Sequence, residues 1–126
     1  MKTGFQQARQ PGQSEMHALI GLLNAGHMPQ AEATARAMLR QYPLTLMLHN
    51  VLGIALESQQ KYADAAVSYR NAIALEPKIA EIHFNLGVVL GHLGRMEEAI
   101  ASYRKAISLK PDLLIVTGKQ IGRAHV

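Results

Sequence analysis

The sequence of 126 residues contains no cysteine and no tryptophan, and aromatic residues make up only 5% of it. Without cysteine, disulfides and thiol chemistry are excluded, and a reducing compartment is permitted. The first residues lack the apolar core of a signal peptide. The longest apolar run near the end, residues 113–116, is far too short to cross a bilayer. We therefore expect a cytoplasmic protein without a membrane anchor.

The chain also lacks a basic surface, although its formal net charge is +4. Four basic residues near the two ends have no acidic neighbours to balance them: Lys2, Arg9, Lys119 and Arg123. Residues 14–112 contain nine basic and nine acidic side chains, so this part of the chain has no net charge. A nucleic-acid-binding protein needs a basic patch on its folded surface. We therefore expect no nucleic-acid partner.

A constant repeat period organises what is present. Pro43, Pro77 and Pro111 are evenly spaced along the chain, and residues 68–77 agree with residues 102–111 at seven of ten positions. A fixed period of this size indicates a stack of one supersecondary unit, because each unit leaves an apolar face that only its neighbour covers. The length allows about three such units, which is near the minimum for a stable stack.

Each unit is predicted to contain two antiparallel helices. Apolar residues recur at steps of three and four, and the expected helices span 14–25, 29–41, 45–59, 62–75, 79–93 and 96–109. Ser14 is the predicted N-cap of the first helix. Gly26 and Gly94 are expected to end helices in the left-handed conformation, with Gln60 at the equivalent place in the second unit. The prolines then stop each second helix.

These units resemble tetratricopeptide repeats. The family pattern has Leu-Gly in the first helix, called helix A, and small, aromatic and alanine positions in helix B before a proline. The second unit matches it with Leu52, Gly53, Ala65, Tyr69, Ala72 and Pro77, and the third with Leu86, Gly87, Ala99, Tyr103, Ala106 and Pro111. The first unit is degenerate, and the family's helix A tryptophan is replaced by His49 and His83. The resemblance implies an all-α, right-handed α-solenoid of about three helix-turn-helix units.

Two glycines inside helices require an explanation. Gly53 and Gly87 each cost about 1 kcal/mol relative to alanine in a helix. We expect close approach of Ala65 and Ala99 from helix B to offset that cost, because two small residues let helices pack tightly.

The domain boundaries follow from the repeat. Residues 1–13 are predicted to be a disordered N-terminal segment, and residues 14–112 the repeat domain, with units at about 12–45, 46–79 and 80–112. Residues 113–126 carry no repeat signal, and residues 121–126 resemble a translated adapter sequence. We therefore expect truncation there, with self-association through an uncapped C-terminal end as one consequence.

The resemblance also implies a binding surface, because helix A lines the concave face in this family. The predicted partner-binding residues are Asn50, Ile54, Glu57, Phe84, Asn85, Val88 and His92, and the positions beside them are Met16, His17, Ile20 and Ser58. The lysine-and-asparagine clamp of chaperone-tail binders is absent, since Ile54 and Val88 occupy its asparagine positions. We expect a protein or peptide partner, because a mixed apolar and amide groove suits an extended or helical peptide.

Catalytic and metal sites are not expected. His49 and His83 repeat at the period without converging ligands, so packing at the edge of the core is favoured over metal binding. Glu97 and Glu98 lie in a first helical turn, where acidic side chains are favoured by the helix dipole. No nucleotide-binding or hydrolase motif occurs. We predict a non-enzymatic scaffold without cofactors.

Two other functions stay open at this stage. Residues 83–87 resemble repeats that precede bacterial protein O-GlcNAc transferases, so the chain could be the substrate-presenting N-terminal arm of a larger glycosyltransferase. The second alternative function is self-assembly through the uncapped C-terminal end.

Overall fold

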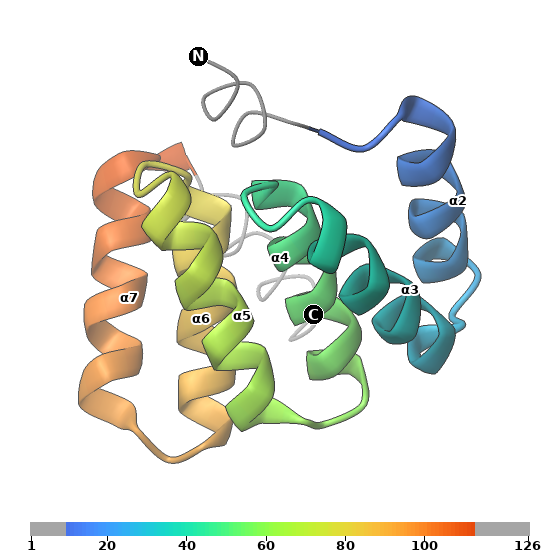
Figure 1. Ribbon diagram of the computed structural model, residues 1–126. Helices are drawn as coiled ribbons and strands as arrows, with labels where there is room; N and C mark the ends of the chain where they lie inside the picture. Colours follow the sequence, from blue (N-terminus) through green and yellow to red (C-terminus); the bar gives the residue numbers. More distant parts are fainter. Residues whose placement is uncertain (1–9, 113–126) are drawn as a thin grey trace.

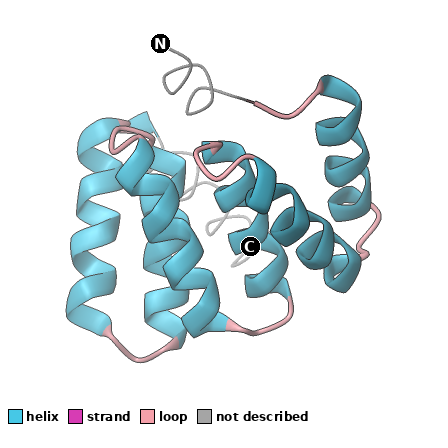
Figure 2. Cartoon of the chain, in the orientation of Figure 1, coloured by secondary structure: helices cyan, strands magenta, loops and turns pink. Residues whose placement is uncertain are grey.

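The computed structural model describes residues 10–112, which contain helices and loops but no strand (Figure 2). In chain order, the helices are α2 (Gln13–Asn24), α3 (Met28–Gln41), α4 (Leu46–Ser58), α5 (Tyr62–Leu75), α6 (Ala80–His92) and α7 (Met96–Leu109). Each lies within one residue of its predicted bounds. Of the segment predicted to be disordered, residues 1–13, only residues 10–13 are described, and Gln13 already begins α2. Residues 1–9 and the expected non-repeat tail at 113–126 lie outside the described residues.

The six helices form three consecutive antiparallel pairs. Within the second and third pairs, α4 packs on α5 and α6 packs on α7. The pairs are joined where α3 packs on α4 and α5 packs on α6, so that consecutive helices are neighbours throughout (Figure 1). The predicted all-α solenoid is therefore confirmed. In this order α2, α4 and α6 are the A helices, and α3, α5 and α7 are the B helices.

The turn inside each helix pair contains one residue with positive φ. Gly26, Gln60 and Gly94 have φ angles of 81°, 63° and 76°. Glycine adopts this region freely, whereas glutamine is strained in it. The strain at Gln60 is thus the cost of following the same turn without a glycine.

The start of α2 differs from the expectation. Ser14 lies inside the helix, and Gly12 is the N-cap. The amide of Gly12 donates a hydrogen bond to Oε1 of Glu15 at 3.0 Å. The prediction failed because Glu15 satisfies the first turn from within the helix, so a serine hydroxyl is not needed there.

The partner of the two helix A glycines also differs. A Cβ on Gly53 would lie 2.5 Å from Cε1 of Tyr69, and one on Gly87 would lie 2.9 Å from ring carbons of Tyr103. The glycines therefore accommodate tyrosine rings one turn beyond Ala65 and Ala99. Both alanines are buried, but the atoms nearest to the added Cβ belong to the tyrosine rings.

The corner between pairs is held by a repeated histidine contact. Nε2 of His49 lies 2.8 Å from the carbonyl oxygen of Pro43, and Nε2 of His83 lies 2.8 Å from that of Pro77. Because a carbonyl oxygen only accepts, Nε2 carries the proton in both rings. Each histidine thus ties helix A to the corner that precedes it.

Candidate functional site

Four of the predicted groove residues lie at corresponding places on two successive A helices. Asn50 and Ile54 on α4 correspond, one repeat later, to Phe84 and Val88 on α6. All four side chains are partly exposed, whereas the opposite sides of both helices are buried. We call Asn50, Ile54, Glu57, Phe84, Asn85, Val88 and His92 the groove face.

Glu57 is fixed by a tyrosine from the B helix of its own pair. The hydroxyl of Tyr69 donates a hydrogen bond to Oε1 of Glu57 at 2.7 Å. Burial of Tyr69, together with this carboxylate, raises the pKa of the hydroxyl far above its ordinary value. The carboxylate of Glu57 is therefore held in a defined position while remaining partly exposed.

Two groove-face rings make contacts inside the fold. Phe84 packs against Tyr103 with ring centroids 5.4 Å apart at 58°. His92 stacks on Tyr62 of α5, with centroids 4.3 Å apart and an interplanar angle of 4°. Tyr62 therefore covers one face of the His92 ring, and Tyr103 contacts the Phe84 ring at an angle.

The two asparagines differ in their surroundings. The side-chain oxygen of Asn50 is buried and accepts no hydrogen bond from a described residue. Such an atom costs free energy, and only a few buried polar atoms per hundred residues lack a partner in native proteins. Asn85 is partly exposed, but its counterpart Val51 in the previous pair is buried. A ladder of equivalent asparagines is therefore not formed.

The first pair contributes a shallow hollow on α2. Pro11, Gln13, Met16, His17 and Ile20 line it. Three of these were predicted from the sequence as neighbours of the groove face. However, α2 contacts α3 and α4 less than the other helices contact one another.

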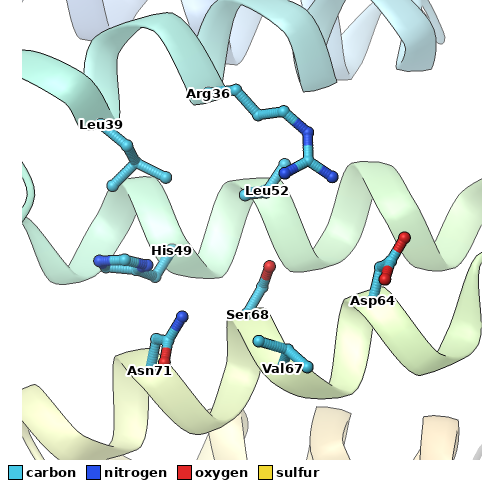
Figure 3. A pocket seen from close by; sticks show the side chains of 8 residues that line it. All are labelled: Arg36, Leu39, His49, Leu52, Asp64, Val67, Ser68 and Asn71. Atoms are coloured by element: carbon cyan, nitrogen blue, oxygen red, sulfur yellow. The ribbon is translucent and has the colours of Figure 1, made fainter.

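A second hollow was not predicted from the sequence. It lies between α3 and α5, above α4, and Figure 3 shows the side chains that line it. The lining residues are Arg36, Leu39, His49, Leu52, Asp64, Val67, Ser68 and Asn71. A step of about 100° per residue places the two α4 members on a different face from Ile54 and Glu57. We call this hollow the helix-B pocket, and no groove-face residue lines it.

One ion pair distinguishes this pocket from the equivalent place in the next pair. Between α5 and α7, Arg70 pairs with Glu98 at 3.1 Å. The counterparts one repeat earlier are Arg36 and Asp64. Arg36 pairs with Glu32 on its own helix at 3.0 Å instead, and Asp64 forms no ion pair within the described part of the chain.

The two repeated histidines have structural contacts rather than shared ligands. Each contacts the carbonyl oxygen of a different proline. Within residues 10–112, no three His, Cys, Asp or Glu side chains are arranged to hold a metal ion. No described helix is both long and apolar enough to cross a lipid bilayer.

Sequence comparison identifies the family. The model of one family, described as "Tetratricopeptide repeat", matches residues 20–69 and again residues 50–113. Together these matches cover well over half of the chain, so this chain belongs to the tetratricopeptide-repeat family. No curated protein matches the sequence.

Several solved structures share the fold. The crystal structure of MamA has a TM-score of 0.77 at 23% identity, over 79% of this chain and 58% of the MamA chain. The second TPR of Spaghetti (RPAP3), bound to the HSP90 peptide SRMEEVD, has a TM-score of 0.77 at 22% identity, over 83% of this chain and 97% of its own. A chain of a type III secretion complex from Aeromonas hydrophila has a TM-score of 0.77 at 18% identity, over 84% of this chain and 73% of its own. This chain thus spans less than two thirds of MamA, and at these identities the likeness shows the fold.

Proposed function

We propose that this protein is an interaction scaffold that binds a peptide or protein segment along the groove face. The observation that carries the proposal is the repeated exposure on two successive A helices. Ile54 and Val88 occupy equivalent places, and both remain partly exposed although they are aliphatic. Amide groups at Asn50 and Asn85 lie on the same helices. Aliphatic side chains provide apolar contact area, and amides provide hydrogen bonds to a peptide backbone.

The size of the described stack supports this proposal. The Spaghetti structure, which has a similar fold, holds a bound peptide, and the matched region is nearly its whole chain. A stack of this length therefore suffices to hold a peptide in that protein. We carry over the mode of binding, namely a short segment held by a rigid helical surface, and not the identity of the peptide.

The first test is a peptide selection on the intact chain. Immobilised protein is used to enrich a random peptide library, and the affinity of a fluorescent selected peptide is then measured by anisotropy. Ile54→Gln with Val88→Gln replaces two aliphatic side chains of the groove face by polar ones without changing its charge, and we expect this variant to lose at least about tenfold in affinity. Circular dichroism verifies that the variant is folded.

The matched control uses the helix-B pocket. Val67 is aliphatic and 58% exposed, so Val67→Gln makes the same change on the other surface. We expect the affinity to stay within about twofold. Loss of binding in Val67→Gln with retention in the groove variant would overturn the proposal, and so would a selection that enriches no peptide.

A second variant separates groove binding from self-association. Asn50→Ala with Asn85→Ala should weaken the peptide complex and leave the sedimentation coefficient of the free protein unchanged. A change in oligomeric state without a change in peptide affinity would instead favour self-assembly as the function. We also propose the units 12–45, 46–79 and 80–112 as the structural repeats. No observation on the described residues favours the glycosyltransferase arm.

A further inference from the structure

The second and third pairs differ at one groove position that the repeat makes comparable. In the second pair, Glu57 accepts the hydrogen bond from Tyr69. The position of Glu57 is taken in the third pair by Gly91, and that of Tyr69 by Tyr103. A Cβ on Gly91 would meet no atom within 4 Å. The third pair therefore has open space where the second has a carboxylate.

The tyrosine beside this space has a hydroxyl without a partner among the described residues. Both tyrosine rings lie over a helix A glycine, Tyr69 over Gly53 and Tyr103 over Gly87. No hydrogen bond joins the hydroxyl of Tyr103 to another residue in the range 10–112, and the side chain is partly exposed. Phe84 packs against its ring. Because Tyr69 reaches Glu57 with its hydroxyl, the equivalent hydroxyl of Tyr103 is the group that borders the gap at Gly91.

The charge near the gap is negative. Glu57 is the one groove-face residue with a carboxylate, and the groove face contains neither lysine nor arginine. Burial raises the pKa of Tyr103, and the negative charge of Glu57 raises it further. Glu57 therefore lies close enough to Tyr103 to interact with it electrostatically. Its Oε2 atom accepts no hydrogen bond from a described residue.

We infer that the groove selects peptides with a lysine or arginine, and that this cation occupies the space over Gly91 between the carboxylate of Glu57 and Tyr103. This inference rests on the proposed function. A cation is attracted by the carboxylate and by the faces of aromatic rings. Its N–H groups also match the acceptors present, namely Oε2 of Glu57 and the hydroxyl oxygen of Tyr103.

The opposite charge on the ligand is disfavoured by the same groups. A ligand carboxylate at this place would face Glu57, and the groove face has no lysine or arginine to offset the repulsion. The peptide SRMEEVD in the Spaghetti structure has three acidic residues and one arginine. We therefore expect the acidic part of that peptide, without its arginine, not to bind at this place, even though the folds are similar.

The experiment uses the peptide obtained from the selection on the intact chain. Its arginine is replaced by citrulline, which keeps the shape and removes the charge, and a lysine is replaced by norleucine. We expect the neutral peptide to bind about tenfold more weakly to the unmodified protein, and this difference to shrink at high salt. Selected peptides without any lysine or arginine would overturn the inference.

Two protein variants locate the subsite. Glu57→Gln keeps an acceptor for the hydroxyl of Tyr69, and it should bind the charged and neutral peptides about equally. Gly91→Leu fills the gap, and it should weaken the charged peptide about tenfold. Gly21→Leu is the matched control, because a Cβ there also meets nothing within 4 Å, and it should bind like the unmodified protein.

The outcomes separate this inference from the proposed function. If the groove variant Ile54→Gln with Val88→Gln binds normally, the proposed function fails. If that variant loses binding while the charged and neutral peptides bind equally well to the unmodified protein, only the basic subsite is wrong. An equal loss of both peptides in Glu57→Gln would likewise refute the subsite.

Discussion

Replacement of Gly53 by alanine tests the packing of helix A against helix B. Alanine favours the helix by about 1 kcal/mol over glycine, so a free position would become more stable. At Gly53, however, the new methyl group would lie 2.5, 2.7 and 2.9 Å from three ring carbons of Tyr69. That ring is completely buried, and its hydroxyl is bonded to Glu57, so it has little freedom to move away.

The expected cost follows from these two opposing contributions. Overpacking of a buried site costs about 1–3 kcal/mol, and the upper end applies because the ring is held at both ends. Subtracting the gain in helix propensity leaves a net destabilisation of about 2 kcal/mol. For a domain of this size, each kcal/mol shifts the melting temperature by roughly 4–8 °C. We therefore expect Gly53→Ala to lower it by about 10 °C.

Two further glycines provide the comparison. A Cβ on Gly87 would lie 2.9 Å or more from Tyr103, whose partly exposed ring can shift, so Gly87→Ala should change stability by less than about 1 kcal/mol. Gly21→Ala meets nothing within 4 Å and should stabilise α2 by up to about 1 kcal/mol.

Urea denaturation followed by far-ultraviolet circular dichroism measures all three variants. The expected order of unfolding free energy is Gly21→Ala, then Gly87→Ala, then Gly53→Ala. If Gly53→Ala is as stable as Gly87→Ala, the placement of the tyrosine rings is wrong.

Three other changes test the turn, an ion-pair cluster and a buried hydroxyl. Gln60→Gly should stabilise the protein by up to about 1 kcal/mol in urea denaturation, because φ is positive there; lower stability would contradict a strained turn. Hydrogen bonds to its carboxylate, above all the one from Lys61, lower the pKa of Glu32 below its ordinary value. Its charged form therefore stabilises the fold above about pH 4.5, and this contribution is lost as the pH falls further; Glu32→Gln should flatten that acid loss in thermal melts. Burial raises the pKa of Tyr69, so the unfolded state ionises first and stability falls above about pH 10. Tyr69→Phe should reduce this alkaline loss and cost about 1.5 kcal/mol at neutral pH through the lost bond to Glu57; unchanged alkaline melting would contradict the buried hydroxyl.

The fold could be predicted closely because its signals are local and repeated. Prolines stop the B helices, and Gly26 and Gly94 turn the chain, and each effect depends on a single residue type. The constant interval between repeats then fixes which helices pair. The helix bounds therefore agree to within one residue.

The packing partners could not be predicted with the same precision. Periodicity places Ala65 and Tyr69 on the same side of helix B, one turn apart, and does not tell which of them reaches Gly53. The ring reaches further than the methyl group, so the tyrosine fills the space. The histidine bond to a proline carbonyl was hidden for a related reason, because its acceptor is a backbone atom.

The helix-B pocket shows why some sites have no sequence signal. Its lining comes from three helices, and no motif connects them. The ion pair that joins the B helices at the next place, between Arg70 and Glu98, is absent here, because Arg36 pairs with Glu32 on its own helix. The assignment of the groove face to a partner stays a prediction, since it depends on a ligand that only an experiment supplies.

The uneven packing of the three pairs has a consequence for how the molecule comes apart. Leu19 is the one buried side chain of α2, whereas α4 and α6 each bury six or more residues. Because each pair is stabilised by its neighbours, unfolding is expected to begin at the least packed end of the stack, which is α2, and to proceed toward the other helices. Amides of α2 would exchange with deuterium before those of α6, and a pulling force applied at this edge would release the molecule in steps and not in a single event.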